Sequence, residues 1–206
     1  MFRNLSDGAK GAYCMIIGSL LLTSQDAITK WMTSSYHAGE ILFYRGIFTF
    51  LPIIFLVLWA GNIKLLKTRS FKSTLLRAVL GSATSVFVVL SFAFLPLATA
   101  LAVIFLSPIL LTTLSVPFLG ERVGWRRWCA VFVGFCGVLL IIQPGQGGVW
   151  IYFLIPLFTA LLVTMRDIVT RRMKGGDTSL SILFYSMVVA VLTGGLSLPI
   201  FGYSLP

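Results

Sequence analysis

Long apolar runs, separated by short polar or basic connectors, extend from one end of the chain to the other. An apolar helix of about twenty residues is long enough to cross the hydrocarbon core of a bilayer. The pattern predicts seven such spans, and it predicts that the lysine-rich segment 61–74 is a connector. The spans are expected at about 11–32, 39–60, 75–95, 97–118, 128–143, 149–166 and 180–201. This pattern is typical of an all-α, polytopic membrane protein.

Composition agrees with this environment, because 58% of the residues are hydrophobic, 11% are charged and the mean hydropathy is +0.98. The net charge of +10 would also suit a nucleic-acid-binding protein. The lysines and arginines, however, lie in short loops between the apolar runs, where the membrane topology already accounts for them. The lipid bilayer is therefore the expected partner, and nucleic acid is not.

The basic residues also predict the orientation of the chain in the membrane. If the seven spans alternate, fourteen lysines and arginines fall on one side and Lys30 alone on the other, while Arg45 lies inside the second span. Positive charge collects on the cytoplasmic side of membrane proteins. We therefore expect a multi-pass membrane protein with its N-terminus in the cytoplasm.

The segment 20–44 has a second copy 141 residues later, at 161–185, with ten identical positions and no gap. Apolar matches arise easily in such a chain, but the shared aspartate, threonines and ILFY run favour an internal repeat. The matches are Leu20/Leu161, Leu21/Leu162, Thr23/Thr164, Asp26/Asp167, Thr29/Thr170, Met32/Met173 and residues 41–44 with 182–185.

The two copies begin in the first and sixth spans, so five spans separate their starts and the copies cross the bilayer in opposite directions. Inverted repeats of this kind are a recurring architecture of secondary transporters. Residues 1–146 are predicted to form a complete five-helix repeat and residues 147–206 the first two helices of a second. We therefore expect seven helices of a ten-helix protein, with about 80 residues lacking from the second repeat.

Residues 97–145 contain a group of small-residue, proline and glycine motifs. They are Ala98, Ala100 and Ala102, the Ser107-Pro108 break, the Leu119-Gly120-Glu121-Arg122 turn, Arg127-Trp128, Gly134-Phe135-x-Gly137-Val138 and Pro144-Gly145. With these motifs the segment resembles the fourth and fifth spans of the drug/metabolite transporter superfamily, in particular the EamA family. The resemblance implies two inverted five-span repeats and transport of a small solute across the bacterial inner membrane. Within that family the pattern is most similar to bacterial importers of S-adenosylmethionine and riboflavin, which also carry an aspartate late in the first span.

Asp26 is the leading candidate for a site residue, because a carboxylate inside a membrane span is costly and seldom idle. It lies about six residues, or roughly 9 Å, from the outer end of the first span. Arg45 enters the second span to a similar depth, so the two side chains could pair across the helices. Two alternatives stay open: Lys30 at i+4 could pair with Asp26 locally, or an ion pair could simply join the helices.

Further polar residues lie close to these two in the sequence. Thr23 and Gln25 could line a cavity, or the threonine could bond back to its own helix. Glu40 and Tyr44 share one face at the start of the second span. Glu40 could be a titrating gate, or it could stand there only because the dipole at a helix N-terminus favours an acidic side chain. Ser107 and Pro108 interrupt the fourth span, either to line a solute path or for packing alone.

These features predict a secondary active transporter that moves a small metabolite or drug-like solute by alternating access. No GxxxxGK[ST] nucleotide-binding motif is present, so the expected driving force is an ion gradient or the solute's own gradient. A proton is the first candidate for the coupling ion, because burial raises a carboxylate pKa and nearby arginine or lysine lowers it, so the protonation of Asp26 could respond to which side is open. No catalytic residue, metal site or cofactor is predicted, and the oligomeric state under consideration is a homodimer. The alternatives are a non-transporting accessory subunit, an inactive fragment or, with less support, a membrane-embedded enzyme.

Overall fold

The computed structural model describes residues 7–59, 68, 70–120, 124–142, 150–173 and 179–201. Across these residues the chain forms eight helical segments. They are α1 (Asp7–Met32), α2 (Ala38–Trp59), α3 (Phe71–Phe94), α4 (Leu97–Ile104), α5 (Ser107–Leu119), α6 (Trp125–Ile142), α7 (Trp150–Arg172) and α8 (Ser179–Phe201).

The helices confirm an all-α, multi-pass membrane protein. Four stretches are long and apolar enough to cross a membrane, Ala38–Phe55, Phe71–Phe94, Leu97–Leu119 and Ile151–Arg172, and Leu180–Leu196 is a shorter apolar helix. The seven predicted spans all correspond to helices, because α4 and α5 are the two halves of the fourth. Many large apolar side chains are exposed on the outside of the bundle, as lipid-facing positions require.

One predicted boundary is wrong. The connector was expected to extend to residue 74, but α3 begins at Phe71, so Lys72 lies in its first turn. Ser70 stands at the N-cap, and the backbone N–H of Thr74 donates to its carbonyl oxygen at 3.0 Å. The first turn of α3 is therefore polar, although it belongs to the same helix as the apolar span. Hydropathy alone does not reveal that the helix begins before the apolar residues do. The rest of the connector, with Lys64, Lys67 and Arg69, falls outside the described residues except at 68 and 70.

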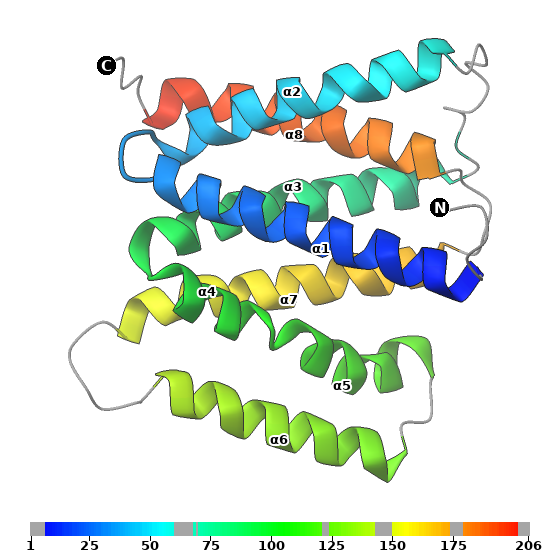
Figure 1. Ribbon diagram of the computed structural model, residues 1–206, viewed down its shortest axis with the longest axis vertical. Coiled ribbons are helices and arrows are strands. Elements are labelled where there is room, and N and C mark those ends of the chain that lie inside the picture. Colours follow the sequence, from blue (N-terminus) through cyan, green and yellow to red (C-terminus); the bar gives the residue numbers. More distant parts are fainter. Residues whose placement is uncertain are drawn as a thin grey trace.

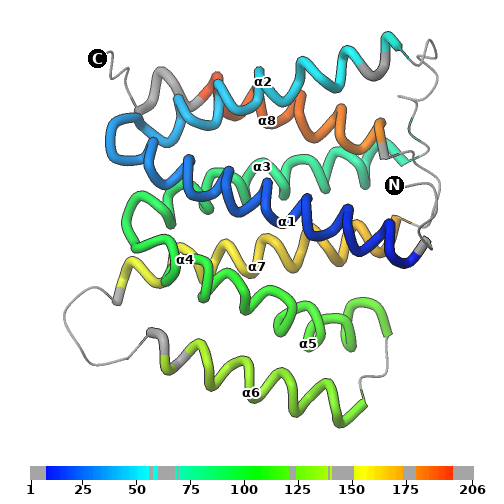
Figure 2. The backbone as a smooth tube through the Cα atoms, viewed as in Figure 1, coloured from blue at the N-terminus to red at the C-terminus, as the bar shows by residue number. Residues whose placement is uncertain are grey.

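The helices lie side by side and run alternately in the two directions (Figure 1). In this view α1 runs from right to left and α7 from left to right, so the first and sixth spans point in opposite directions, as predicted. Closest neighbours are α2 with α8, α3 with α7 and α8, and α7 with α4 and α5. The last turns of α2, α5 and α7 lie at the same end of the bundle as the start of α1 (Figure 2).

Two glycines bring α2 and α8 into direct contact. A Cβ on Gly46 would lie 2.9 Å from Val191 Cγ2, and a Cβ on Gly194 would lie 2.8 Å from the Cα and N atoms of Phe43. Only residues without side chains permit so close an approach. Mapped back by 141 positions, Val191 and Gly194 correspond to positions 50 and 53, so both contacts have position 48 as their midpoint. Contacts between any two antiparallel helices share a midpoint in this way, so the arrangement agrees with the opposite directions of α2 and α8.

The fourth span is interrupted between α4 and α5, where Phe105 and Leu106 form a turn. Pro108 stands at the start of α5 and has no N–H to donate to the carbonyl of Ile104, which explains where the helix breaks. A buried apolar cluster of Val103, Leu106, Val138 and Ala160 holds both halves against α6 and α7. The break predicted at Ser107-Pro108 is thus present, two residues before the proline.

Candidate functional site

A polar cavity of about 170 Å³ lies at the crossing of α2 and α8, and α1 and α3 complete its wall. α2 contributes four positions on one helical face, at i, i+3, i+4 and i+7. α8 contributes two apolar residues, and α1 and α3 contribute one polar residue each. The lining residues are Gln25, Leu42, Arg45, Gly46, Thr49, Ser85, Met187 and Ala190.

Arg45 carries the positive charge of this cavity, and Asp26 lies close enough to interact with it electrostatically from a different helix. Both are partly buried. Asp26 and Arg45 are not joined by an N–O distance of 4.0 Å or less, whereas Arg166 and Asp167 are. Each of the two charges can therefore bind another group without first breaking a direct ion pair.

Lys30 does not pair with Asp26, so the first alternative is wrong. Its ammonium group instead donates to the carbonyl oxygens of Phe92 and Leu95, the second at 3.1 Å. These carbonyls belong to the last turn of α3, where a cation is favoured by the helix dipole. Lys30 therefore joins α1 to α3 and leaves Asp26 to Arg45.

Thr23 bonds back to its own helix, donating to the carbonyl oxygen of Ser19 at 2.9 Å. It is exposed and lies outside the cavity wall, whereas Gln25 is part of that wall. Glu40 is buried in the first turn of α2, and Tyr44, four residues later, is 53% exposed. Glu40 and Tyr44 are therefore in different environments although their spacing places them on one helical face, and neither lines this cavity.

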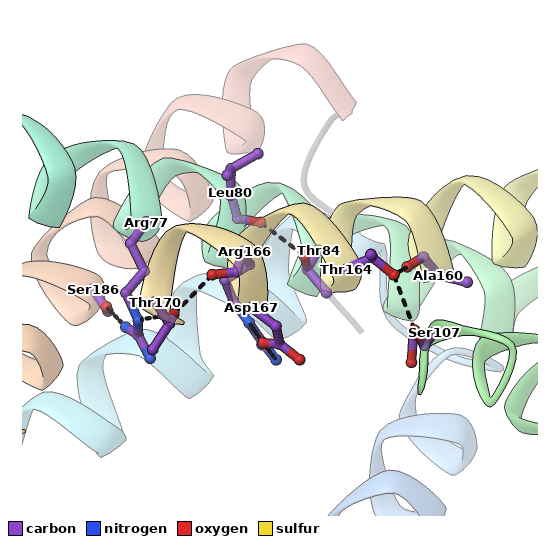
Figure 3. A network of polar contacts seen from close by, with 10 residues as sticks. All are labelled: Arg77, Leu80, Thr84, Ser107, Ala160, Thr164, Arg166, Asp167, Thr170 and Ser186. Atoms are coloured by element: carbon purple, nitrogen blue, oxygen red, sulfur yellow. Dashed lines mark hydrogen bonds and ion pairs between the residues drawn. The ribbon is translucent and has the colours of Figure 1, made fainter. Parts of the chain in front are cut away.

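Ser107 and Pro108 lie on the far side of α7 from the cavity. The hydroxyl of Thr164 donates to the carbonyl oxygen of Ser107 at 3.2 Å and to that of Ala160 at 2.8 Å (Figure 3). Thr164 and Ser107 are both buried. The interrupted span is thus tied to α7 through a backbone carbonyl, and in this conformation the break contributes to packing.

A second polar network links α3, α7 and α8 (Figure 3). Arg77 donates from Nε to Thr170 Oγ1 at 2.9 Å and from Nη1 to Ser186 Oγ at 3.2 Å. Beside it, Arg166 and Asp167 form an ion pair at 3.0 Å. Three helices therefore meet at one guanidinium group.

Sequence reasoning missed several of these residues. Arg77 was counted among the cytoplasmic charges, although it stands inside the predicted third span just as Arg45 stands inside the second. Thr49 lies four residues after Arg45, so a helical face drawn through the arginine would have included it. Ser85 and Met187 carry no such signal, because the pattern does not reveal which faces of α3 and α8 meet α2.

The described residues contain no group of three or more histidines, cysteines, aspartates or glutamates that could hold a metal ion. The chemistry of the cavity is instead that of one guanidinium group, one nearby carboxylate, an amide and two hydroxyls. Such a set can bind a small group bearing both charge and hydrogen-bonding atoms.

The sequence of this chain is similar to those of known membrane transporters. A family described as the EamA-like transporter family matches residues 9–143. The chain is 30% identical to the S-adenosylmethionine uptake transporter of Rickettsia prowazekii, covering 91% of this chain and 63% of that protein. It is 28% identical to the riboflavin transporter of Rhizobium johnstonii, covering 95% of this chain and 65% of the relative.

A third relative is the pseudopaline exporter CntI of Pseudomonas aeruginosa, 26% identical over 88% of this chain and 64% of the relative. The chain therefore spans somewhat less than two thirds of the length of these three relatives. No solved structure matches it.

Proposed function

Because the chain belongs to the EamA-like transporter family, a family of transporters and not of enzymes, we propose that it forms the cavity-bearing part of a secondary transporter for a small polar solute. The observation that carries this proposal is the polar cavity at the α2–α8 crossing, with Arg45 in its wall and Asp26 beside it. Substrate sites of inverted-repeat transporters lie near the midplane, at the interface of the repeats.

The proposal depends on the inverted repeat, which the ten identical positions of the two copies support. Gly46 contacts Val191 and Gly194 contacts Phe43, and α2 and α8 run in opposite directions (Figure 1). The cavity lies at this crossing. A rocking motion of one repeat against the other would therefore open it first to one side of the membrane and then to the other.

Arg45 is the residue we propose to bind the anionic group of the solute. A guanidinium group offers a planar fork of donors that fits a carboxylate or a phosphate. Gln25, Thr49 and Ser85 add hydrogen-bonding groups to the same wall. Asp26 would hold a cationic group of the solute or take up the coupling proton, since its charge is otherwise costly within a span.

The cavity volume narrows what can enter. About 170 Å³ is less than the roughly 300–1,000 Å³ of pockets that enclose a drug-sized ligand. The cavity in this conformation would therefore take a polar end group and not a whole nucleoside or flavin. The relatives are named for different solutes, which are S-adenosylmethionine, riboflavin and pseudopaline. Their names therefore do not define the solute of this chain.

Uptake into vesicles tests the proposal. Two forms would be reconstituted, the chain alone and the chain joined to the C-terminal third of a relative. Uptake of labelled S-adenosylmethionine and riboflavin would be measured for both. We expect S-adenosylmethionine, which has a carboxylate, to accumulate, and riboflavin serves as the solute without an anionic group. Arg45→Gln should lower the initial rate of S-adenosylmethionine uptake by about tenfold or more, as loss of a charged hydrogen-bonding partner does. Arg126→Gln, at an exposed arginine in α6, is the matched control.

Two outcomes would count against transport through this cavity. One is uptake that Arg45→Gln leaves at the parent rate. The other is the lack of uptake of any solute in a broader metabolite panel by either form, which would favour an accessory subunit. The exposed apolar side chains along α1, such as Met15 and Leu21, are where an accessory role would place a partner helix.

A further inference from the structure

Arg77 contacts the second copy of the repeat at positions with defined counterparts in the first. Its two hydrogen-bond acceptors are Thr170 and Ser186, which correspond to Thr29 and Arg45. Two charges of α7 also act on it, because Arg166 repels it and Asp167, the counterpart of Asp26, attracts it. The second copy has thus lost an arginine at position 186, and an arginine from another helix reaches that same position.

We propose that Arg77 supplies, from α3, the guanidinium group that the second copy lacks at Ser186, and that it acts as a positioning residue for the cavity. Arg45 and Arg77 would then be counterparts on either side of the α2–α8 crossing. Positions 45 and 186 each lie about three residues, or roughly 4.5 Å along a helix, from the midpoint of that crossing.

The hydrogen bonds make Arg77 a specific link between helices. The hydroxyl of Thr170 donates to the carbonyl oxygen of Arg166 at 2.7 Å, and that of Ser186 donates to Ile182 at 2.7 Å. Each hydroxyl hydrogen is therefore directed at its own helix, so each oxygen presents a lone pair to the arginine. The planar guanidinium group then fixes the relative position of α7 and α8 along α3.

This link reaches the cavity through the same two helices. Ser186 precedes Met187, a cavity residue on α8. On α3, Arg77 lies eight residues before Ser85, about 12 Å along the helix, and Ser85 forms the facing part of the wall. Arg77 therefore sets how far apart these two sides of the cavity stand without touching a solute itself.

The competing explanation is that Arg77 is one more basic residue at the membrane surface. A surface arginine extends towards water or lipid phosphate and makes no specific helix contacts. Arg77 is instead partly buried and bonded to two other helices. Arg166 approaches α3 at Gly81, where a Cβ would lie 3.8 Å from the Cδ atom of Arg166. The network therefore lies where α3, α7 and α8 meet.

Relocating the charge tests the inference on the chain as it exists. Cys14, Cys129 and Cys136 would be replaced by alanine, and cysteines placed at Ser85 and Met187 would be joined by a short bifunctional thiol reagent in membranes. We expect Arg77→Ala to lower the cross-linking yield about threefold or more, as loss of a charged link between helices should. Combining Arg77→Ala with Ser186→Arg should restore at least about half of the parent yield, because the new side chain starts where the old one ended.

Arg126→Ala serves as the control for removal of an arginine and should leave the yield unchanged. An unchanged yield in Arg77→Ala would overturn the proposal. A lowered yield that Ser186→Arg does not restore would show that the link must start from α3, which overturns the assignment of Arg77 as the counterpart of Arg45.

If Arg77→Ala fails to insert, Arg77→Gln, which retains donors without the charge, takes its place with the same two outcomes. The inference concerns the cavity of the proposed transporter, but cross-linking needs no solute. A failure of transport would therefore leave this result readable.

Discussion

The ammonium nitrogen of Lys30 lies 3.1 Å from the carbonyl oxygen of Leu95, where α3 ends and the chain turns into α4. The same group also donates to the carbonyl of Phe92, a residue whose side chain is fully buried. One cation thus satisfies carbonyls at the end of α3 that have no partner within the helix. Through this contact α1 is joined to the centre of the bundle.

Replacing Lys30 should therefore destabilise the protein more than its partly exposed position suggests. We expect Lys30→Met to lower the free energy of unfolding by about 1–3 kcal/mol, because the α3 carbonyls lose a charged donor. Thermal unfolding in detergent measures this, with Trp31→Met at the neighbouring exposed position as the control. Equal melting temperatures for both variants would contradict the role of Lys30.

The α2–α8 contact gives a prediction with an internal control. Gly194→Ala places a Cβ 2.8 Å from backbone atoms of Phe43, which cannot rotate away, and we expect a loss of about 1–3 kcal/mol. Gly18→Ala in α1 meets no atom within 4 Å and should be neutral or stabilising by up to about 1 kcal/mol, since alanine favours helix. Melting temperatures in detergent of the two variants should therefore move in different directions or differ clearly.

The threonine pair of the repeat provides a third comparison. Thr164→Val removes the hydrogen bond to Ser107 at the broken span, and we expect a loss of about 1 kcal/mol. Thr23→Val at the matched position removes only a bond to its own helix and should change stability by less than about 0.5 kcal/mol. Similar losses for both would show that the contact at the break adds nothing.

Asp26 is expected to matter for energy coupling and not for folding. Asp26→Asn keeps the size of the side chain and removes its titration, so solute exchange should persist while accumulation driven by a proton gradient is lost. Uptake into vesicles with and without an imposed gradient measures both. Ser24→Ala, whose hydroxyl bonds to its own helix, should retain the response. Gradient-driven accumulation by Asp26→Asn at the parent level would remove Asp26 from the coupling mechanism.

The orientation can be tested by labelling single cysteines from each side of the membrane. Ser34 follows α1 and Ser70 precedes α3, and both are exposed. The end of α1 and the start of α3 lie at opposite ends of the bundle (Figure 1). With the N-terminus in the cytoplasm, an impermeant thiol reagent should label Ser34→Cys from the outside only and Ser70→Cys from the cytoplasm only. The reverse pattern would invert the predicted topology.

The sequence alone was sufficient to predict the helices, but not to predict which helices pack against each other. Hydropathy placed the seven spans, and Pro108 placed the break, because both are local properties of the chain. The alternative partner considered for Lys30 was wrong, since a helical i+4 neighbour can be read from sequence whereas the end of α3, more than sixty residues away, cannot. Asp26 and Arg45 stand at similar depths on consecutive helices and interact electrostatically, but their direct pairing stays a prediction.

The rest of the cavity depends on long-range packing. Met187 and Ala190 are apolar residues in an apolar helix, and only the glycine contacts with α2 turn them towards Arg45. The internal repeat implied that α8 runs opposite to α2, but it did not specify that these two helices touch. That information lies in Gly46 and Gly194, whose missing side chains become informative only when both helices are in view.

The contact between α2 and α8 has a mechanical consequence. Where bulky side chains interlock, two helices can change their angle only by exchanging rotamers, in discrete steps. At Gly194 the closest atoms are backbone atoms of Phe43, and at Gly46 the closest atom is a methyl group of Val191, so few side chains separate the two helices. We therefore expect the angle between α2 and α8 to be limited less by side-chain packing at this crossing than by the contacts at the helix ends.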